Sequence, residues 1–114
     1  MEQLLQGRLT IGRERYGHGV QVDSDTRAWG TPTNSWIDMA LEEFLDGIIY
    51  LVADYVRSGR ESEMGMCELE LEYGEHHTCD DNDLILFIVR NYERIESLKH
   101  KKLIGNLIRM CAEI

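Results

Sequence analysis

Apolar and polar residues repeat with a helical period from Asn34 to Arg57, the clearest such pattern in the chain. At about 100° per residue, the large apolar side chains fall on one half of a helix and most carboxylates fall on the other. Good N-cap residue types precede the pattern from Thr33 to Ser35, and Gly59 follows it. We therefore predict a central helix over residues 34–57. Its expected core face contains Ile37, Leu41, Phe44, Leu45, Ile48, Leu51, Val52 and Tyr55.

Helical spacing also occurs towards both ends of the chain. The residues up to Ile11 predict a short amphipathic helix with Leu4, Leu5 and Leu9 on its apolar side, and the stretch from Arg8 to Ile11 is also compatible with the start of a strand. Residues 82–112 predict either two helices, with Ser97 capping the second, or one long bent helix, because lysines in the first turns of a separate last helix oppose its dipole. The inward side chains expected here are Leu84, Ile85, Ile88, Val89, Tyr92, Ile95, Leu103, Ile104, Leu107, Ile108 and Cys111.

Two stretches lack a helical period. Residues 12–33 contain four glycines and the only proline, so we predict an irregular loop, and its aromatic residues favour an ordered one. Within residues 60–81, apolar residues alternate with glutamates from Cys67 to Tyr73. A period of two predicts a strand, although glutamate is a poor strand former. We interpret residues 60–81 as an extended segment or a mobile acidic connector.

Together these elements predict a mostly α-helical fold, in which residues 1–114 form a single domain resembling a helical bundle. The formal net charge of −9 argues against a protein that binds nucleic-acid polymers by neutralising their phosphates. The chain has no run of about 18 apolar residues, and its N-terminus lacks the pattern of a signal peptide, so we expect no membrane association and a cytoplasmic location. The three cysteines are then expected to be free thiols.

Carboxylates on the polar half of the central helix are the first candidate for chemistry. Glu42 and Glu43 stand four and three residues before Asp46, and both spacings place side chains above one another on a helix. Carboxylates at this spacing repel one another, and Mg²⁺ or Mn²⁺ relieves the repulsion because hard cations prefer carboxylate oxygens. The alternative is a solvated polar face, which is common on helices.

The sequence Glu43-Phe44-Leu45-Asp46 and the apolar run after it resemble the second acidic box, E-x-x-D, of MazG-like nucleoside triphosphate pyrophosphohydrolases. Residues 13–57 also resemble small phage-encoded proteins of this type. The resemblance implies an all-α NTP pyrophosphatase-like fold, a homo-oligomer (dimer or tetramer), and Mg²⁺-dependent cleavage of nucleoside triphosphates to monophosphate and pyrophosphate. The family's earlier E-E-x-x-E box is missing before Asn34, so Glu42-Glu43-x-x-Asp46 would serve as a merged box for catalysis and metal binding. Further ligands would come from a second subunit or from Glu68, Glu70 or Glu72.

The loop is the second candidate, because a nucleotide site needs cations for the phosphates and aromatic faces for the base. Gly17 and Gly19 would let backbone N–H groups approach phosphate oxygens. The alternative is that the tryptophans cover the core while the arginines pair with the carboxylates. The candidate nucleotide-binding residues are Arg13, Arg15, Tyr16, His18, Arg27, Trp29, Asn34 and Trp36.

A third candidate is the group Cys67, His76, His77 and Cys79, because thiolates and imidazoles bind zinc. Their spacing matches no common zinc pattern, so scattered surface residues are the simpler interpretation. A Cys–His nucleophile has no supporting signature in this segment.

Three functional hypotheses follow. The first is a Mg²⁺-dependent nucleotide pyrophosphohydrolase of a phage, acting in the host cytoplasm. The second is a non-catalytic protein that binds a nucleotide, for instance a signalling nucleotide. The third is a host-directed interaction protein that acts through its acidic surface.

Overall fold

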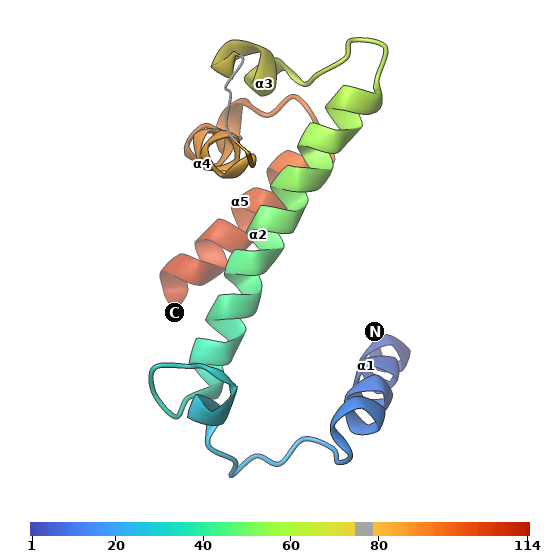
Figure 1. Cartoon of the computed structure of the whole chain (residues 1–114), viewed down its shortest axis with the longest axis vertical. Coiled ribbons are helices and arrows are strands. Elements are labelled where there is room, and N and C mark those ends of the chain that lie inside the picture. The colour runs from blue at the N-terminus through green and yellow to red at the C-terminus, as the bar shows by residue number, and fades with distance from the viewer. Residues whose placement is uncertain (75–78) are drawn as a thin grey trace. The chain divides into compact units, whose positions relative to one another are not determined.

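The computed structural model describes residues 1–74 and 79–114, which form two compact units, residues 1–35 and residues 36–114. The helices are α1 (Glu2–Tyr16), the 3-10 helix η1 (Thr26–Trp29), α2 (Trp36–Glu61), α3 (Glu68–Tyr73), α4 (Asn82–Arg90), the 3-10 helix η2 (Tyr92–Arg94) and α5 (Leu98–Glu113) (Figure 1). The described residues contain no β-strand, and the predicted mostly α-helical fold class is therefore confirmed.

The second unit is organised around α2 and α5, which run side by side in opposite directions (Figure 1). Near the start of α5, His100 bonds Asp54 in the second half of α2, with 2.7 Å between Nε2 and Oδ2. Further along α5, Leu107 lies against Gly47, where a methyl group built on the glycine would be 3.2 Å from Cδ1 of Leu107. The predicted central helix is confirmed, and it begins two residues later and continues four residues further than expected.

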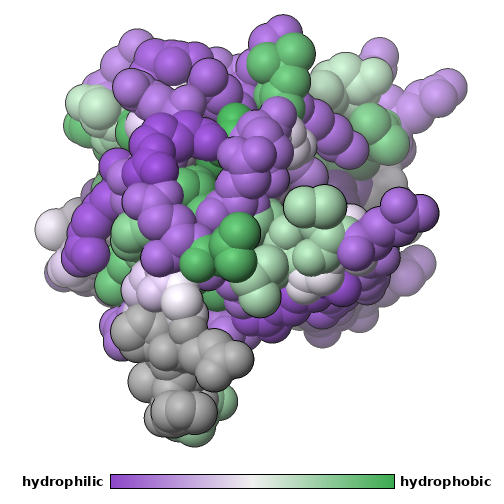
Figure 2. All heavy atoms as spheres, turned by 90° about the horizontal axis from the view of Figure 1, so that it is seen from above, coloured by the Kyte–Doolittle hydropathy of each residue, from purple (hydrophilic) through white to green (hydrophobic). Residues whose placement is uncertain are grey.

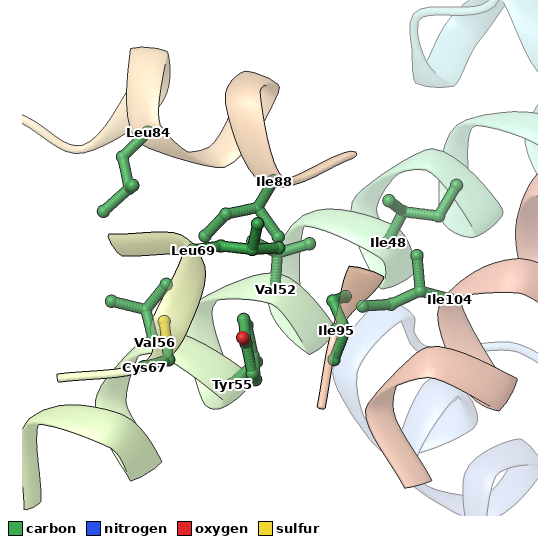
Figure 3. Packing of buried hydrophobic residues seen from close by; sticks show 10 residues of the cluster. All are labelled: Ile48, Val52, Tyr55, Val56, Cys67, Leu69, Leu84, Ile88, Ile95 and Ile104. Carbon is green, nitrogen blue, oxygen red and sulfur yellow. The ribbon is translucent and has the colours of Figure 1, made fainter. Parts of the chain in front are cut away.

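The core of this unit forms where α3, α4 and α5 meet the second half of α2. Figure 3 shows Leu69 of α3 and Ile88 of α4 converging on Val52, while Cys67 lies close to Val56. Burying large apolar side chains from four helices supplies the main favourable term for this unit. The buried apolar residues are Ile48, Val52, Tyr55, Val56, Cys67, Leu69, Leu84, Ile88, Ile95 and Ile104.

The prediction of a strand within residues 60–81 is wrong, because Glu68–Tyr73 forms α3. Glutamate favours helix over strand, and this preference decided the conformation here. The helix buries Leu69 and starts directly after Cys67. The chain turns back closely before it, since a methyl group built on Gly59 would lie 2.4 Å from the backbone nitrogen of Cys67.

The C-terminal region is a helix pair, so the alternative of one long bent helix is wrong. The helix α4 ends at Arg90, η2 follows, and α5 begins after Ser97. The Ser97 hydroxyl oxygen accepts a hydrogen bond from the His100 backbone N–H, as expected for an N-cap residue. The lysines of the first turns therefore do belong to a separate last helix.

In the first unit, α1 continues to Tyr16, five residues beyond the predicted end at Ile11. Gly17 then ends the helix in the left-handed conformation, with φ of 81°, a common helix C-cap for glycine. Arg13, Arg15 and Tyr16 therefore lie on a helix and not in the predicted loop over residues 12–33. The expected amphipathic core face is also not formed, because no residue of α1 is buried.

Several residues predicted for the core are exposed along the first half of α2. Ile37 is 58% exposed and Leu45 is 47% exposed, although their helical positions continue the buried face of the second half. Apolar residues therefore remain on the surface. Figure 2, which views the molecule from the end where α2 finishes, shows hydrophobic residues in small groups among hydrophilic ones.

Candidate functional site

The predicted metal-binding residues form an open group of carboxylates on α2. We call Glu42, Glu43 and Asp46 the acid ridge. All three are exposed, and helical geometry places them on neighbouring turns. No described residue forms an ion pair with any of the three. The acid ridge therefore has free oxygen donors of the kind that Mg²⁺ prefers.

One chain does not complete a metal site around the acid ridge. Among residues 1–74 and 79–114, no group of three or more His, Cys, Asp or Glu side chains is arranged to hold a metal ion. Further ligands for a bound ion would then have to come from water, from substrate phosphates or from another copy, as is common for Mg²⁺.

The glutamates of α3, which we expected as possible further ligands, lie elsewhere. Glu70 is bound by Arg60 in the last turn of α2, with 2.6 Å between Oε2 and Nη2, and this contact raises the pKa of Arg60. Arg60 is 14 residues after Asp46, which corresponds to about 21 Å of helix. Glu72 is similarly occupied, because Arg94 forms an ion pair with it. Glu70 and Glu72 therefore do not complete the acid ridge of their own chain.

The loop before α2 is ordered by a buried hydroxyl group. Thr26 is fully buried, and its Oγ1 lies 2.8 Å from Oγ1 of Thr31. The same oxygen accepts a hydrogen bond from the Ser35 N–H at 2.7 Å, and the Thr26 N–H donates to Oδ1 of Asn34 at 3.1 Å. Because these bonds join residues less than ten positions apart, the loop from Asp25 to Ser35 is held by its own polar groups. The expected order of this part of the loop is confirmed.

Most of the predicted nucleotide-binding residues have other roles or positions in the structure. Arg27 binds Asp25 through two nitrogens, and this partner raises the pKa of Arg27 and lowers that of Asp25. Asn34 uses its carboxamide oxygen to hold Thr26. His18 lies within hydrogen-bonding distance of its neighbour, with Nδ1 2.7 Å from the Gly19 carbonyl oxygen. These contacts make Arg27 and Asn34 structural residues of the loop.

Three predicted aromatic residues, from Tyr16 to Trp36, have exposed rings. Trp29 and Trp36 are 46% and 40% exposed, and Tyr16 at the end of α1 is more exposed still. The alternative prediction, that the tryptophans cover the core, is wrong, because neither belongs to the buried cluster. Trp29 is presented by η1, which Asp25 caps by accepting a hydrogen bond from the Arg27 N–H.

A chain of polar contacts between α2 and α5 was missed at the sequence level. The His100 ring is mostly buried and lies between Ser97, with 2.5 Å from Oγ to Nδ1, and Asp54. The hydrogen bond from His100 lowers the pKa of Asp54. The neighbouring Tyr55 donates to Glu96 at 2.5 Å, and burial, followed by this bond, raises the Tyr55 pKa. Only the predicted Ser97 cap pointed to this region, because the partners lie more than 40 residues apart.

This polar chain holds α5 against α2 and has the geometry of a structural clamp. Ser97 caps the helix with the same oxygen that contacts His100, so its hydroxyl is committed on both sides. Tyr55 packs beside the His100 ring with 5.6 Å between ring centroids. We assign these residues to the stability of the helix pair.

The structure describes two of the four candidate zinc residues. Cys67 is buried in the core, whereas Cys79 is exposed, and both are free thiols. His76 and His77 lie outside the described residues. Cys67 is therefore a core residue.

No protein-family model, curated protein or solved structure matches this chain. Along the described part of the chain, no helix combines the length and the apolar character that a membrane span requires.

Proposed function

We propose that this protein is a Mg²⁺-dependent nucleotide pyrophosphohydrolase in which Glu42, Glu43 and Asp46 hold the ion. The observation that carries this proposal is the acid ridge: three exposed carboxylates on neighbouring turns of one helix, without a cationic partner among the described residues. A divalent ion would relieve the repulsion among these carboxylates and would also bind the phosphate oxygens of a nucleotide. The similarity of residues 43–46 to the E-x-x-D box supports the same assignment.

In the proposed reaction, water attacks the α-phosphorus of a nucleoside triphosphate and the bond to the β-phosphate breaks, giving monophosphate and pyrophosphate. A bound Mg²⁺ would neutralise the phosphates and lower the pKa of its water ligand. The carboxylate of Glu43 would orient the attacking water and accept its proton. Within the unit that carries the acid ridge, the exposed ring of Trp36 is the candidate for stacking on the base.

The test is incubation of the pure protein with a panel of nucleoside triphosphates, with and without Mg²⁺ or Mn²⁺, followed by chromatography of the products. We expect metal-dependent monophosphate and pyrophosphate. The Glu43→Gln variant should lose about 100-fold or more of the rate, the usual contribution of a general base. Glu63→Gln removes one carboxylate from an exposed residue after α2 and serves as the matched control, with an unchanged rate. Intact nucleotide in every sample would refute the hydrolase for that panel.

A second candidate function is nucleotide binding without hydrolysis. It is favoured by one observation: among the described residues, no three or more His, Cys, Asp or Glu side chains are arranged so that they could hold a metal ion together. A binder is expected to gain several degrees in melting temperature with nucleotide and to leave the nucleotide intact. Trp29→Ala, compared with the wild type in the same thermal-shift assay, shows whether the loop contributes to this binding.

A further inference from the structure

Charge is distributed unevenly between the helices of the second unit. Residues 1–35 contain four acidic and four basic side chains, so residues 36–114 carry the whole formal charge of −9. Within that acidic unit, α5 is an exception, because it contains four cationic residues and only one acidic residue, Glu113. One helix of an acidic unit is therefore positively charged.

The cations of α5 lie mainly on its solvent side. Lys99, Lys102 and Arg109 follow one another at intervals of three and seven residues and are all exposed. Leu103 and Met110 lie on the same side and are 40% and 43% exposed. We call these five residues the cationic face of α5. The residues that bury this helix, including His100 and Ile104, lie on its opposite side.

The lysines of this face are unfavourable for an isolated α5. A helix N-terminus carries a partial positive charge, so a lysine in the first turns opposes it by about 0.3–1 kcal/mol. No described acidic side chain forms an ion pair with Lys99 or Lys102. Lys99 does lie close enough to Asp54 to lower its pKa, but only as a minor cause after His100.

The acid ridge presents the complementary situation. Its carboxylates repel one another and have no cationic partner in the described chain. Apolar side chains flank it as they flank the cations of α5, because Leu45, Ile49 and Tyr50 are all more than two-fifths exposed. The two surfaces thus match in both respects: opposite charge, and exposed apolar groups that association would bury.

We propose that two copies of this chain associate with the cationic face of each α5 lying along the acid ridge of the other copy. Each copy carries one surface of each kind, so a pair related by a two-fold axis can form both contacts at once. This contact would offset the unfavourable interaction of the lysines with the helix dipole of α5, and it would reduce the repulsion among the carboxylates of the acid ridge. The proposal rests on charge and exposure. Because the partner's lysines would lie on the carboxylates that the proposed function assigns to Mg²⁺, Mg²⁺ and the second copy would compete for the acid ridge.

Complementary charge reversal tests this arrangement. In Lys99→Glu/Lys102→Glu, both surfaces are acidic; in Glu42→Lys/Asp46→Lys, both are basic. Each variant alone should be monomeric in analytical ultracentrifugation at low salt, with a dissociation constant raised about tenfold or more over wild type. An equal mixture of the two variants should restore the dimer, because every contact then joins opposite charges. High salt should weaken the wild-type and the mixed dimers alike.

The matched control for Lys99→Glu/Lys102→Glu is Arg8→Glu/Arg90→Glu, which makes the same change in net charge at two exposed positions outside both surfaces. It should associate as the wild type does, and circular dichroism of every variant confirms that the helices are intact. A monomeric wild type, or a mixture that stays monomeric, would overturn the proposal. So would a wild-type monomer whose cationic face binds nucleoside triphosphate, since the occupant would then be a small anion and not a second copy.

Discussion

The two halves of α2 share one sequence pattern and have different surroundings. In the second half, Ile48, Val52 and Tyr55 are buried under α3, α4 and α5. In the first half, Ile37 and Leu45 occupy the corresponding side of the helix and remain about half exposed. The pattern of apolar residues thus predicts which side of a helix is able to be buried. Whether that side is buried depends on the lengths of the other helices, which the pattern of α2 does not contain.

The largest expected effect compares the same substitution in the two halves. Ile48→Ala should lower the free energy of unfolding by about 3 kcal/mol, because it removes apolar contacts from a closely packed core. Ile37→Ala should change it by less than about 0.5 kcal/mol, as is usual for exposed positions. Urea unfolding at low protein concentration measures both. Equal losses would show that the first half is buried in solution as the second half is.

A smaller effect separates two glycines of the same helix. Gly59→Ala should cost about 1–3 kcal/mol, since the new methyl group would meet the backbone of Cys67, which cannot move aside easily. Gly47→Ala meets only the end of the Leu107 side chain, and the better helix propensity of alanine offsets that contact. In thermal unfolding, Gly59→Ala should therefore lower the melting temperature, whereas Gly47→Ala should leave it nearly unchanged or raise it. A stable Gly59→Ala would mean that the turn before α3 is less tight than the structure shows.

The smallest effect concerns the two tyrosines of α2 and depends on pH. Folding raises the Tyr55 pKa, so the corresponding stability is fully present below pH 10 and is lost as the pH rises above it. Tyr55→Phe should cost about 1 kcal/mol at pH 7, through the lost hydrogen bond to Glu96, and should remove this part of the alkaline loss. Tyr50→Phe, at an exposed position, should leave the loss of stability at alkaline pH unchanged. Urea unfolding between pH 8 and 11 makes the comparison.

The sequence predicted the elements with strong local signals. The central helix followed from its period and caps, and the Ser97 cap correctly indicated a separate last helix. The helix α3 was missed because its apolar residues alternate, and only one of them, Leu69, is buried along its short length. The extent of α1 was missed because Gly12 and three charged residues follow Ile11 without any apolar residue before Tyr16.

The candidate site was predictable in composition but not in arrangement. The exposed positions of Glu42, Glu43 and Asp46 follow from the helical period alone. The pairing of Arg27 with Asp25 was not anticipated, although the two residues are only two positions apart, because a bidentate contact depends on the local turn of η1. The clamp of Asp54 and His100 depends on the packing of α2 against α5, which no local pattern contains.

The three free thiols of the second unit allow local opening of its structure to be measured by their reactivity. Cys79 is exposed, Cys111 is half-buried and Cys67 is buried behind the close turn at Gly59. A thiol reagent reaches a buried cysteine only when the structure around it opens. When reclosing is faster than the chemistry, the reaction rate of Cys67 is proportional to the fraction of time for which the junction of α2 and α3 is open, and the exposed Cys79 serves as the internal reference. The chain thereby reports local unfolding at its core without any added label.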